Sequence, residues 1–192
     1  MKPGYFFNPF MKFQEHTLLI TGIISLLLAS WVAAALNIIY DGVINIHLTT
    51  GQNFISALLQ NIIAIIVLFV FLYGISLFVN QHTRAIDILN VALIFRIPLY
   101  LMAFVIPATK PILKKLPDIQ KMEQFKPSGP DLILLTLIGF VSLAVLAYAV
   151  VLLINGFKTA TNAKKWFHIL LVVAGLFVAD LIAKIIITRV FL

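Results

Sequence analysis

The 192-residue chain contains no cysteine and very little charge. The absence of cysteine excludes a disulfide framework, a thiolate metal site and a cysteine nucleophile. Only 11% of the residues are charged, whereas 62% are hydrophobic, and the mean hydropathy is +1.09. Soluble domains contain about 45–50% apolar residues. The composition therefore excludes a water-soluble domain and predicts a protein that lies mostly in a membrane.

The sequence also lacks recognisable enzyme and metal motifs. The histidines are dispersed, with no pair at the spacing of a helical zinc site; they are His16, His47, His82 and His168. There is no Gly-x-Ser-x-Gly motif and no glycine-rich phosphate loop. The net charge of +7 is spread over short segments, so no folded basic face for nucleic acid is expected. We expect a protein that is not an enzyme, uses no metal or cofactor and binds no nucleic acid.

Long apolar runs are what the sequence does contain. Each of five runs exceeds the about 20 residues that a helix needs to cross the hydrocarbon core. The predicted spans are residues 17–40, 54–79, 86–106, 132–154 and 166–192. We therefore predict an all-α, polytopic membrane protein, a bundle of five transmembrane helices in one membrane domain. Residues 1–16 are expected to form a short interfacial head, and residues 107–131 a Lys- and Pro-rich loop.

The third and fifth spans contain charged residues, so their insertion needs a comparison of free energies. The 13 Leu, Ile, Phe and Val residues of the third span favour insertion by roughly 4–8 kcal/mol, against about 3 kcal/mol for the central Arg96. The fifth span contains Asp180, whereas Lys184 and Arg189 lie near its end and can extend to the interface. We expect both segments to span the membrane. The alternative is that one of them is re-entrant or interfacial.

Arg96 and Asp180 are the residues that cost most to place in a membrane. Arg96 lies about 15 Å along the third span and Asp180 about 21 Å along the fifth, and both helices run in the same direction. We therefore predict that they pair across the bundle near the midplane. The alternatives are a local pair of Asp180 with Lys184 and a functional proton or ion relay. The complete predicted polar network comprises Arg96, Asp180, Lys184, Asn61 and Asn90.

Three further features concern helix shape and packing. Pro98 is predicted to kink the third span and to free the carbonyl of Ile94 for Arg96; the alternative is a tolerated proline without a role. Gly156 is predicted to cap the fourth span in a left-handed conformation. Small residues recur every four positions in the first and fifth spans, which predicts close helix packing. These residues are Ser25, Ala29 and Ala33, and Gly175, Ala179 and Ala183.

Lysines near the ends of the spans are predicted to contact lipid headgroups. They are Lys114, Lys115, Lys121, Lys126, Lys164 and Lys165. The loop 107–131 either forms two short amphipathic turns, with Ile119, Met122 and Phe125 toward lipid, or is a solvated connector.

The orientation prediction depends on the first span. Lys2 and Lys12 precede it, and residues 41–53 after it contain no Lys or Arg, whereas the totals of the two sides are nearly equal. We predict a multi-pass protein of the bacterial inner (cytoplasmic) membrane, with its N-terminus inside and its C-terminus outside. The alternative of a cleaved signal peptide is disfavoured by Glu15 in the leader and by the length of the apolar run.

Several motifs occur along the chain in a recognisable order. The head contains Phe7-Asn8-Pro9-Phe10. Arg84-Ala-Ile-Asp87-Ile-Leu leads to Phe95-Arg96-Ile97-Pro98-Leu99 in the third span. Leu153-Ile-Asn-Gly156-Phe-Lys158-Thr-Ala160 connects the last two spans. In this order the chain resembles the Yip family of five-span membrane proteins, named for interacting with Ypt/Rab GTPases, and specifically its short bacterial branch.

The resemblance implies a non-enzymatic scaffold or interaction protein in membrane organisation or trafficking-like assembly. The implied partners are the lipid bilayer, other membrane proteins or further copies of the chain. Rab GTPase binding is not expected, because the sequence lacks the long cytosolic N-terminal region and the Asp-Leu-Tyr-Gly-Pro motif of the eukaryotic relatives. The alternative function is a small transporter or channel-like subunit with Arg96 and Asp180 in a polar path.

Overall fold

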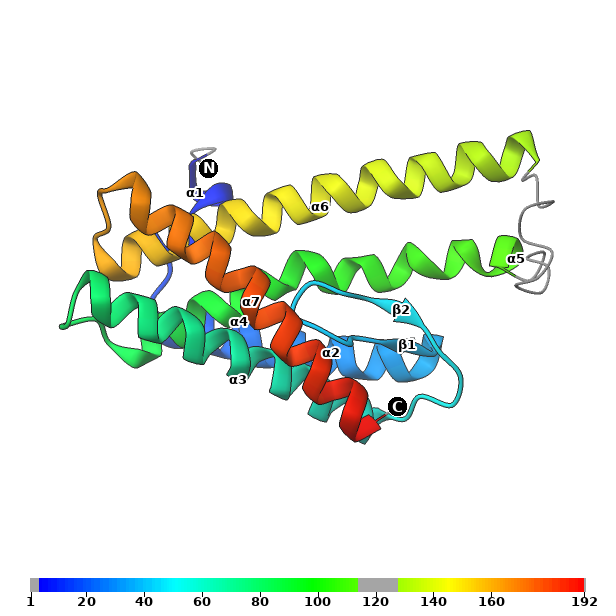
Figure 1. The fold of residues 1–192 in the computed structure, drawn as a ribbon, viewed down its shortest axis with the longest axis horizontal. Coiled ribbons are helices and arrows are strands. Elements are labelled where there is room, and N and C mark those ends of the chain that lie inside the picture. Colours follow the sequence, from blue (N-terminus) through cyan, green and yellow to red (C-terminus); the bar gives the residue numbers. More distant parts are fainter. Residues whose placement is uncertain (1–3, 114–127, 192) are drawn as a thin grey trace.

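Five long helices dominate the computed structural model, which describes residues 4–113 and 128–191 (Figure 1). They are α2 (Glu15–Leu36), α3 (Phe54–Val79), α4 (Ala85–Leu101), α6 (Gly129–Thr161) and α7 (Trp166–Phe191). The short helical segments are α1 (Gly4–Phe7), η1 (Pro9–Met11), η2 (Met102–Phe104), η3 (Ile106–Thr109) and α5 (Lys110–Leu113). Each long helix, with α4 continued to Ile112, is long and apolar enough to cross a membrane. The prediction of an all-α bundle of five transmembrane helices is confirmed.

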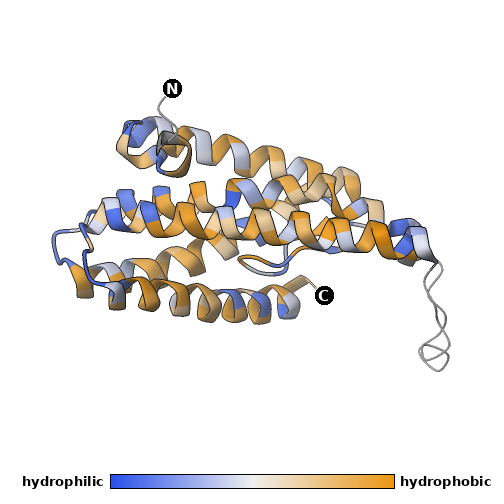
Figure 2. Cartoon of the chain, turned by 90° about the horizontal axis from the view of Figure 1, so that it is seen from above, coloured by the Kyte–Doolittle hydropathy of each residue, from blue (hydrophilic) through white to orange (hydrophobic). Residues whose placement is uncertain are grey.

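Helix α4 lies at the centre of the bundle. It packs against α2, α3 and α6, while α7 packs mainly against α3. Of its membrane-spanning stretch 72% is buried, against 17% for α6, the most exposed span. Hydrophobic residues also cover the outer faces of the helices (Figure 2), including Ile20, Trp31 and Phe140, as expected where lipid surrounds the protein.

Small residues allow the helices to approach closely. In α2, Ala29 and Ala33 are buried, and in α7 the whole predicted stripe of Gly175, Ala179 and Ala183 is buried. A Cβ atom on Gly175 would lie 2.6 Å from the side chain of Ile75 in α3. The small-residue stripe of α7 therefore packs against α3, as van der Waals packing in membranes favours.

Two asparagines end helices where the sequence analysis placed the boundaries elsewhere. Helix α2 ends at Leu36, four residues before the predicted end, because Asn37 adopts a left-handed conformation with φ 54°. Helix α6 extends to Thr161, and the next residue, Asn162, caps it in a left-handed conformation with φ 55°. The predicted cap at Gly156 is wrong, since this residue lies inside α6.

The third and fourth spans also extend into the predicted loop. Helical turns continue from α4 through η2 and η3 to α5, so the chain remains helical up to Leu113 rather than ending at Ile106. Helix α6 begins at Gly129, where the Ser128 side chain accepts a hydrogen bond from the Asp131 N–H and Pro130 occupies the first turn. The apolar runs thus predicted the central part of these two helices and missed the ends that extend into residues 107–131.

The head segment folds back on α6. The carbonyl of Phe6 accepts a hydrogen bond from the Tyr148 hydroxyl at 2.9 Å, and that of Phe7 accepts one from the Asn155 amide at 2.9 Å. The Phe6 and Tyr148 rings stack, with centroids 4.9 Å apart. The predicted interfacial head is therefore held to the end of α6 by specific contacts.

Between α2 and α3 the chain forms a hairpin that returns into the bundle. Its strands are β1 (Ile38–Ile39) and β2 (His47–Leu48), paired antiparallel with Ile38 opposite Leu48. In Figure 1 the hairpin runs back alongside the helices from the end where the C-terminus lies. Ile38, Tyr40 and Val43 are buried, so the hairpin is part of the core.

Candidate functional site

The tip of the β1–β2 hairpin and the side chain of Arg96 form the polar centre of the bundle. Arg96 lies about 16 Å along α4 and is 1% exposed. One of its terminal nitrogens, Nη1, donates to the carbonyls of Gly42 at 3.0 Å and Val43 at 3.1 Å. These carbonyls belong to a turn that has no regular backbone partners. Arg96 therefore satisfies irregular backbone at the depth of the membrane, which is tolerated only inside protein.

The other nitrogens of Arg96 also have partners. Nε donates to the Tyr100 hydroxyl at 3.2 Å, and Nη2 donates to the Asn61 carbonyl oxygen at 2.8 Å. The guanidinium lies 5.8 Å from the Tyr40 ring centre and 5.3 Å from that of Tyr100. Hydrogen bonds to a charged group contribute about 1.5–3 kcal/mol each. Four of them outweigh the about 3 kcal/mol that a central Arg costs on insertion.

Asn61 links this centre to α2. Its amide nitrogen donates to the Ser30 hydroxyl and to the Ala57 carbonyl, both at 3.1 Å, and Ser30 donates in turn to the Leu26 carbonyl. Asn61 and Ser30 are fully buried. The chain of donors and acceptors from Arg96 through Asn61 thus ends at backbone within the protein.

Asp180 holds the other side of the same hairpin tip. One carboxylate oxygen accepts the Ile44 N–H at 2.9 Å, and the other accepts the Asn45 amide at 2.7 Å. Gly42 leaves room for this carboxylate, because a Cβ atom there would lie 2.5 Å from an Asp180 oxygen. Arg96 therefore binds the carbonyls and Asp180 the N–H side of one turn.

A third charged contact lies along the hairpin. Asp41, which is buried, is 2.8 Å from Nδ1 of His47 and 4.0 Å from the Lys184 ammonium. Lys184 comes from α7, one turn beyond Asp180. Two charged residues of the last helix thus contact the hairpin between the first two long helices.

The predicted direct pair of Arg96 and Asp180 is wrong, and so is the local pair of Asp180 with Lys184. Arg96 and Asp180 lie at similar depth, yet each binds the hairpin tip instead of the other. The predicted network also divides, because Asn90 donates to the carbonyl of Glu15 at 3.1 Å, near the start of α4. The hairpin lies between the two charges, whereas the sequence predicts residues 41–53 only as the link between the first two spans.

Pro98 and the lysines have separate locations. Pro98 lies inside α4, which continues to Leu101, and Arg96 takes its carbonyl partners from the hairpin rather than from Ile94. Lys164 and Lys165 are exposed in the link between α6 and α7, where lipid headgroups are expected. The other predicted headgroup contacts, Lys114, Lys115, Lys121 and Lys126, lie outside the described residues.

The residues that sequence reasoning missed belong to the hairpin and its aromatic contacts. They are Ser30, Tyr40, Asp41, Gly42, Asn45, His47 and Tyr100. One signal was available, since the segment after the first span contains Val43, Ile44 and Ile46. Such an apolar link is unusual for an exposed loop and is typical of a buried one.

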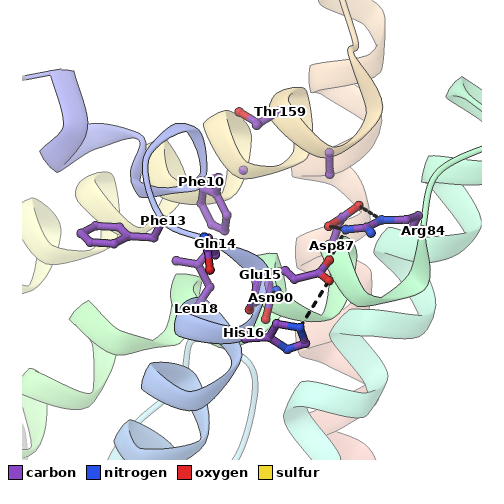
Figure 3. A pocket seen from close by; sticks show the side chains of 12 residues that line it. Phe10, Phe13, Gln14, Glu15, His16, Leu18, Arg84, Asp87, Asn90 and Thr159 are labelled. Atoms are coloured by element: carbon purple, nitrogen blue, oxygen red, sulfur yellow. Dashed lines mark hydrogen bonds and ion pairs between the residues drawn. The ribbon is translucent and has the colours of Figure 1, made fainter.

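A second polar region lies where α2 and α4 begin and α6 ends (Figure 3). Arg84 binds Asp87 through two nitrogens, at 3.0 and 2.8 Å, and also contacts Glu15. The side-chain hydrogen bond to Asp87 raises the pKa of Arg84, so the guanidinium remains charged at neutral pH. These residues line a cavity of about 450 Å³ together with Phe10, His16 and Asn90, among others.

No family model, no curated protein and no solved structure matches this chain. Within residues 4–113 and 128–191, no group of three or more His, Asp or Glu side chains is placed to hold a metal ion. The function is therefore argued from the geometry of the two polar regions.

Proposed function

We propose that this protein is a non-enzymatic integral membrane scaffold, which organises other membrane components in the manner implied by the Yip family resemblance. The observation that carries the proposal is the use of the membrane-embedded charges. Every nitrogen of Arg96 and both carboxylate oxygens of Asp180 bind groups of the same chain. Charges used in this way hold a hairpin in place, as expected of a structural role.

The contacts between the quoted motifs support the family proposal. Asn8 of the head donates to the Thr159 hydroxyl at 3.1 Å, and Thr159 lies in the last turns of α6, where the sequence predicted a connector. The Phe10 ring lies against Gly156, where a Cβ atom would be 2.6 Å from it. Residues of the head motif and of the 153–160 motif thus meet at one end of the bundle, although they lie far apart in the sequence, whereas Phe95–Leu99 lies in the middle of α4.

The exposure of α6 supports an assembly role. Its first half, from Leu132 to Leu143, has no buried residue, and Ile133, Leu137 and Phe140 are strongly exposed. In a membrane this face contacts lipid or another helix. A second copy or another membrane protein would find a long, exposed apolar face there.

A flux assay tests the scaffold proposal against the transporter alternative. The purified protein is placed in liposomes under an imposed gradient, and proton movement is followed with a pH-sensitive dye and potassium movement with a potassium-sensitive dye. A scaffold should give the same rate as protein-free liposomes, and Asp180→Asn should lower only the thermal stability. A protein-dependent flux that disappears in folded Asp180→Asn would instead establish a polar path.

Self-association is tested with single-cysteine labels, which the cysteine-free chain permits. Copies that carry Gly139→Cys on the exposed face of α6 are labelled with donor or acceptor dyes and mixed in vesicles. Energy transfer should persist as lipid is added if copies associate. Energy transfer that falls in proportion to dilution would exclude self-association. The scaffold would then assemble with a different protein.

We also propose that the N-terminus lies inside and the C-terminus outside the bacterial cytoplasmic membrane. The end of the bundle with the starts of α2, α4 and α7 contains Lys12, Arg84, Lys164 and Lys165, in line with a positive inner side. Thr50→Cys, at the opposite end, should react with an impermeant maleimide in intact cells. Lys164→Cys should react only after permeabilisation, and the reverse result would invert the topology.

A further inference from the structure

We propose that the groove between α2 and α6, over α4, binds one phospholipid with a primary ammonium headgroup, phosphatidylethanolamine. The headgroup would occupy the polar cavity lined by Glu15, Arg84 and Asp87, and an acyl chain would follow the groove into the bundle. This binding site is independent of the scaffold proposal, since a transporter could hold the same lipid.

Three cavities follow one another along α2 and α4. The polar cavity and the next one, of about 320 Å³, share Phe13 and Leu18. The second and a third, of about 330 Å³, share Ile97. On α4 the lining residues progress from Asp87 to Leu101, which is about 21 Å of helix. This exceeds the about 15 Å of hydrocarbon in one leaflet, so the groove is long enough for an acyl chain.

The polarity of the lining changes along the groove. The middle cavity has α4 as its floor, with Ile94, Ile97 and Pro98, and is bordered by Thr21 of α2 and Leu152 of α6. The third cavity is lined by apolar side chains and two polar ones, Ser25 and Tyr100. A polar opening at the helix ends followed by an apolar groove matches the shape and polarity of a phospholipid.

The charges at the opening favour a cationic group. Glu15 and Asp87 carry two negative charges, and Arg84 provides one positive charge between them (Figure 3). These three side chains together carry one net negative charge. The rings of Phe10 and Phe13 line the same cavity, and aromatic rings attract ammonium groups. An ammonium near the carboxylates would leave its phosphate near Arg84 and His16, the two potential cations of the lining.

Asn90 provides a second observation at the same place. It is 1% exposed, lines the polar cavity, and donates through its amide nitrogen to the Glu15 carbonyl. Its amide oxygen accepts no hydrogen bond from any residue in the described part of the chain. A buried acceptor without a donor is costly, and a primary ammonium has three donors.

Lipid selectivity of the purified full-length protein tests the headgroup. Native mass spectrometry is recorded with equal amounts of phosphatidylethanolamine, phosphatidylcholine and phosphatidylglycerol carrying the same acyl chains. We expect retention of phosphatidylethanolamine about tenfold above phosphatidylcholine, the equivalent of one charge-assisted hydrogen bond. Phosphatidylglycerol should bind more weakly still, because its headgroup has a net negative charge. Equal retention of the three lipids, or preference for phosphatidylglycerol, overturns the proposal.

Two pairs of variants locate the site. Thr21→Phe fills the middle of the groove, and Thr136→Phe makes the same change on the exposed face of α6, away from the three cavities. Thr21→Phe should lower phosphatidylethanolamine retention about tenfold, while Thr136→Phe should not.

Asp87→Asn should remove the preference over phosphatidylcholine, whereas Asp87→Glu should keep it. Circular dichroism checks that each variant is folded. If Thr21→Phe does not fold, the lipid selectivity of the wild-type protein decides the proposal. Equal effects of the two Phe variants would place the lipid elsewhere.

Discussion

The two polar regions of the molecule use the same kinds of residue in opposite ways. At the hairpin tip, the buried Arg96 and the half-buried Asp180 bind backbone and amide groups of their own chain. At the helix ends, Arg84 pairs with Glu15 and Asp87, and its side chain is 60% exposed. In the first arrangement both charges bind groups of their own chain inside the bundle, while the second surrounds a cavity and keeps a surplus charge. Enclosure therefore separates a charge that holds the fold from one that is available to a ligand.

The energetic consequence of this difference is large. A charge in the interior loses hydration and must recover it from fixed partners, so loss of one partner leaves others unsatisfied. A charge at the membrane surface is compensated by water and ions, so its pairs contribute little to stability. The comparison fails if a substitution at the hairpin tip leaves the stability unchanged, or if a substitution in the helix-end cluster lowers it strongly.

Replacement of Arg96 should have the largest effect. Arg96→Met leaves the carbonyls of Gly42 and Val43 and the Asn61 oxygen without their donor, which is expected to cost about 3–5 kcal/mol of unfolding free energy. The measurement is the unfolding transition in detergent mixtures. Arg189→Met, at an exposed Arg of α7, is the control and should remain near wild type. A small loss at Arg96 would mean that the hairpin is held by its apolar residues alone.

Crowding of the hairpin tip should have the next largest effect. In Gly42→Ala the new methyl group would lie 2.5 Å from an Asp180 oxygen and 3.1 Å from the Asn45 amide. The carboxylate must move away from its donors, at an expected cost of about 1–3 kcal/mol. Gly139→Ala, where a Cβ atom meets nothing within 4 Å, is a matched control. Equal stability of the two variants would show that Asp180 can shift freely.

At the other end of the bundle, Gly156→Ala should cost about 1 kcal/mol, because the new methyl group would lie 2.6 Å from the Phe10 ring, which can shift with the short head segment, and 2.9 Å from the Val91 side chain of α4. Phe10→Leu in the same chain should recover part of this loss, since the two residues are in contact and their effects should not add. The four unfolding free energies of this double-mutant cycle measure the coupling. Strict additivity would argue that the head segment does not rest on Gly156 in solution.

The smallest effect on stability is expected at the exposed ion pair. Asp87→Asn removes one of the two acidic partners of Arg84, and the unfolding midpoint should stay within the scatter of wild-type measurements. The same variant should change lipid selectivity, as described above. A clear drop in the midpoint would show that the helix-end cluster is structural, and the contrast with the hairpin tip would be lost.

The spans could be predicted because insertion depends on summed apolar surface. Phe54–Val79 was predicted to the residue, since Asn53 caps its start and both ends coincide with polar residues. The ends of α2 and α6 were misplaced, although Asn37 and Asn162 are residue types that adopt the left-handed cap. Hydropathy is insensitive to such caps because a helix can continue beyond the apolar run or end within it.

The candidate site was predicted in part. The common depth of Arg96 and Asp180 follows from the rise of a helix, and Asn61 does bind Arg96. The partners of the two charges did not follow, because depth along an axis leaves open what lies between two helices. Hairpin residues such as Asn45 become relevant only when the chain folds back into the bundle.

The sequence by itself determined that this protein lies in a membrane and how many long helices cross it, because both depend on how many apolar residues occur in succession. It also fixed which charged residues would need partners in the membrane. Only the tertiary structure decided that the hairpin supplies those partners, and that the starts of α2 and α4 and the end of α6 enclose a charged cavity. These arrangements depend on contacts between segments far apart in the chain, and no local pattern of residues encodes them.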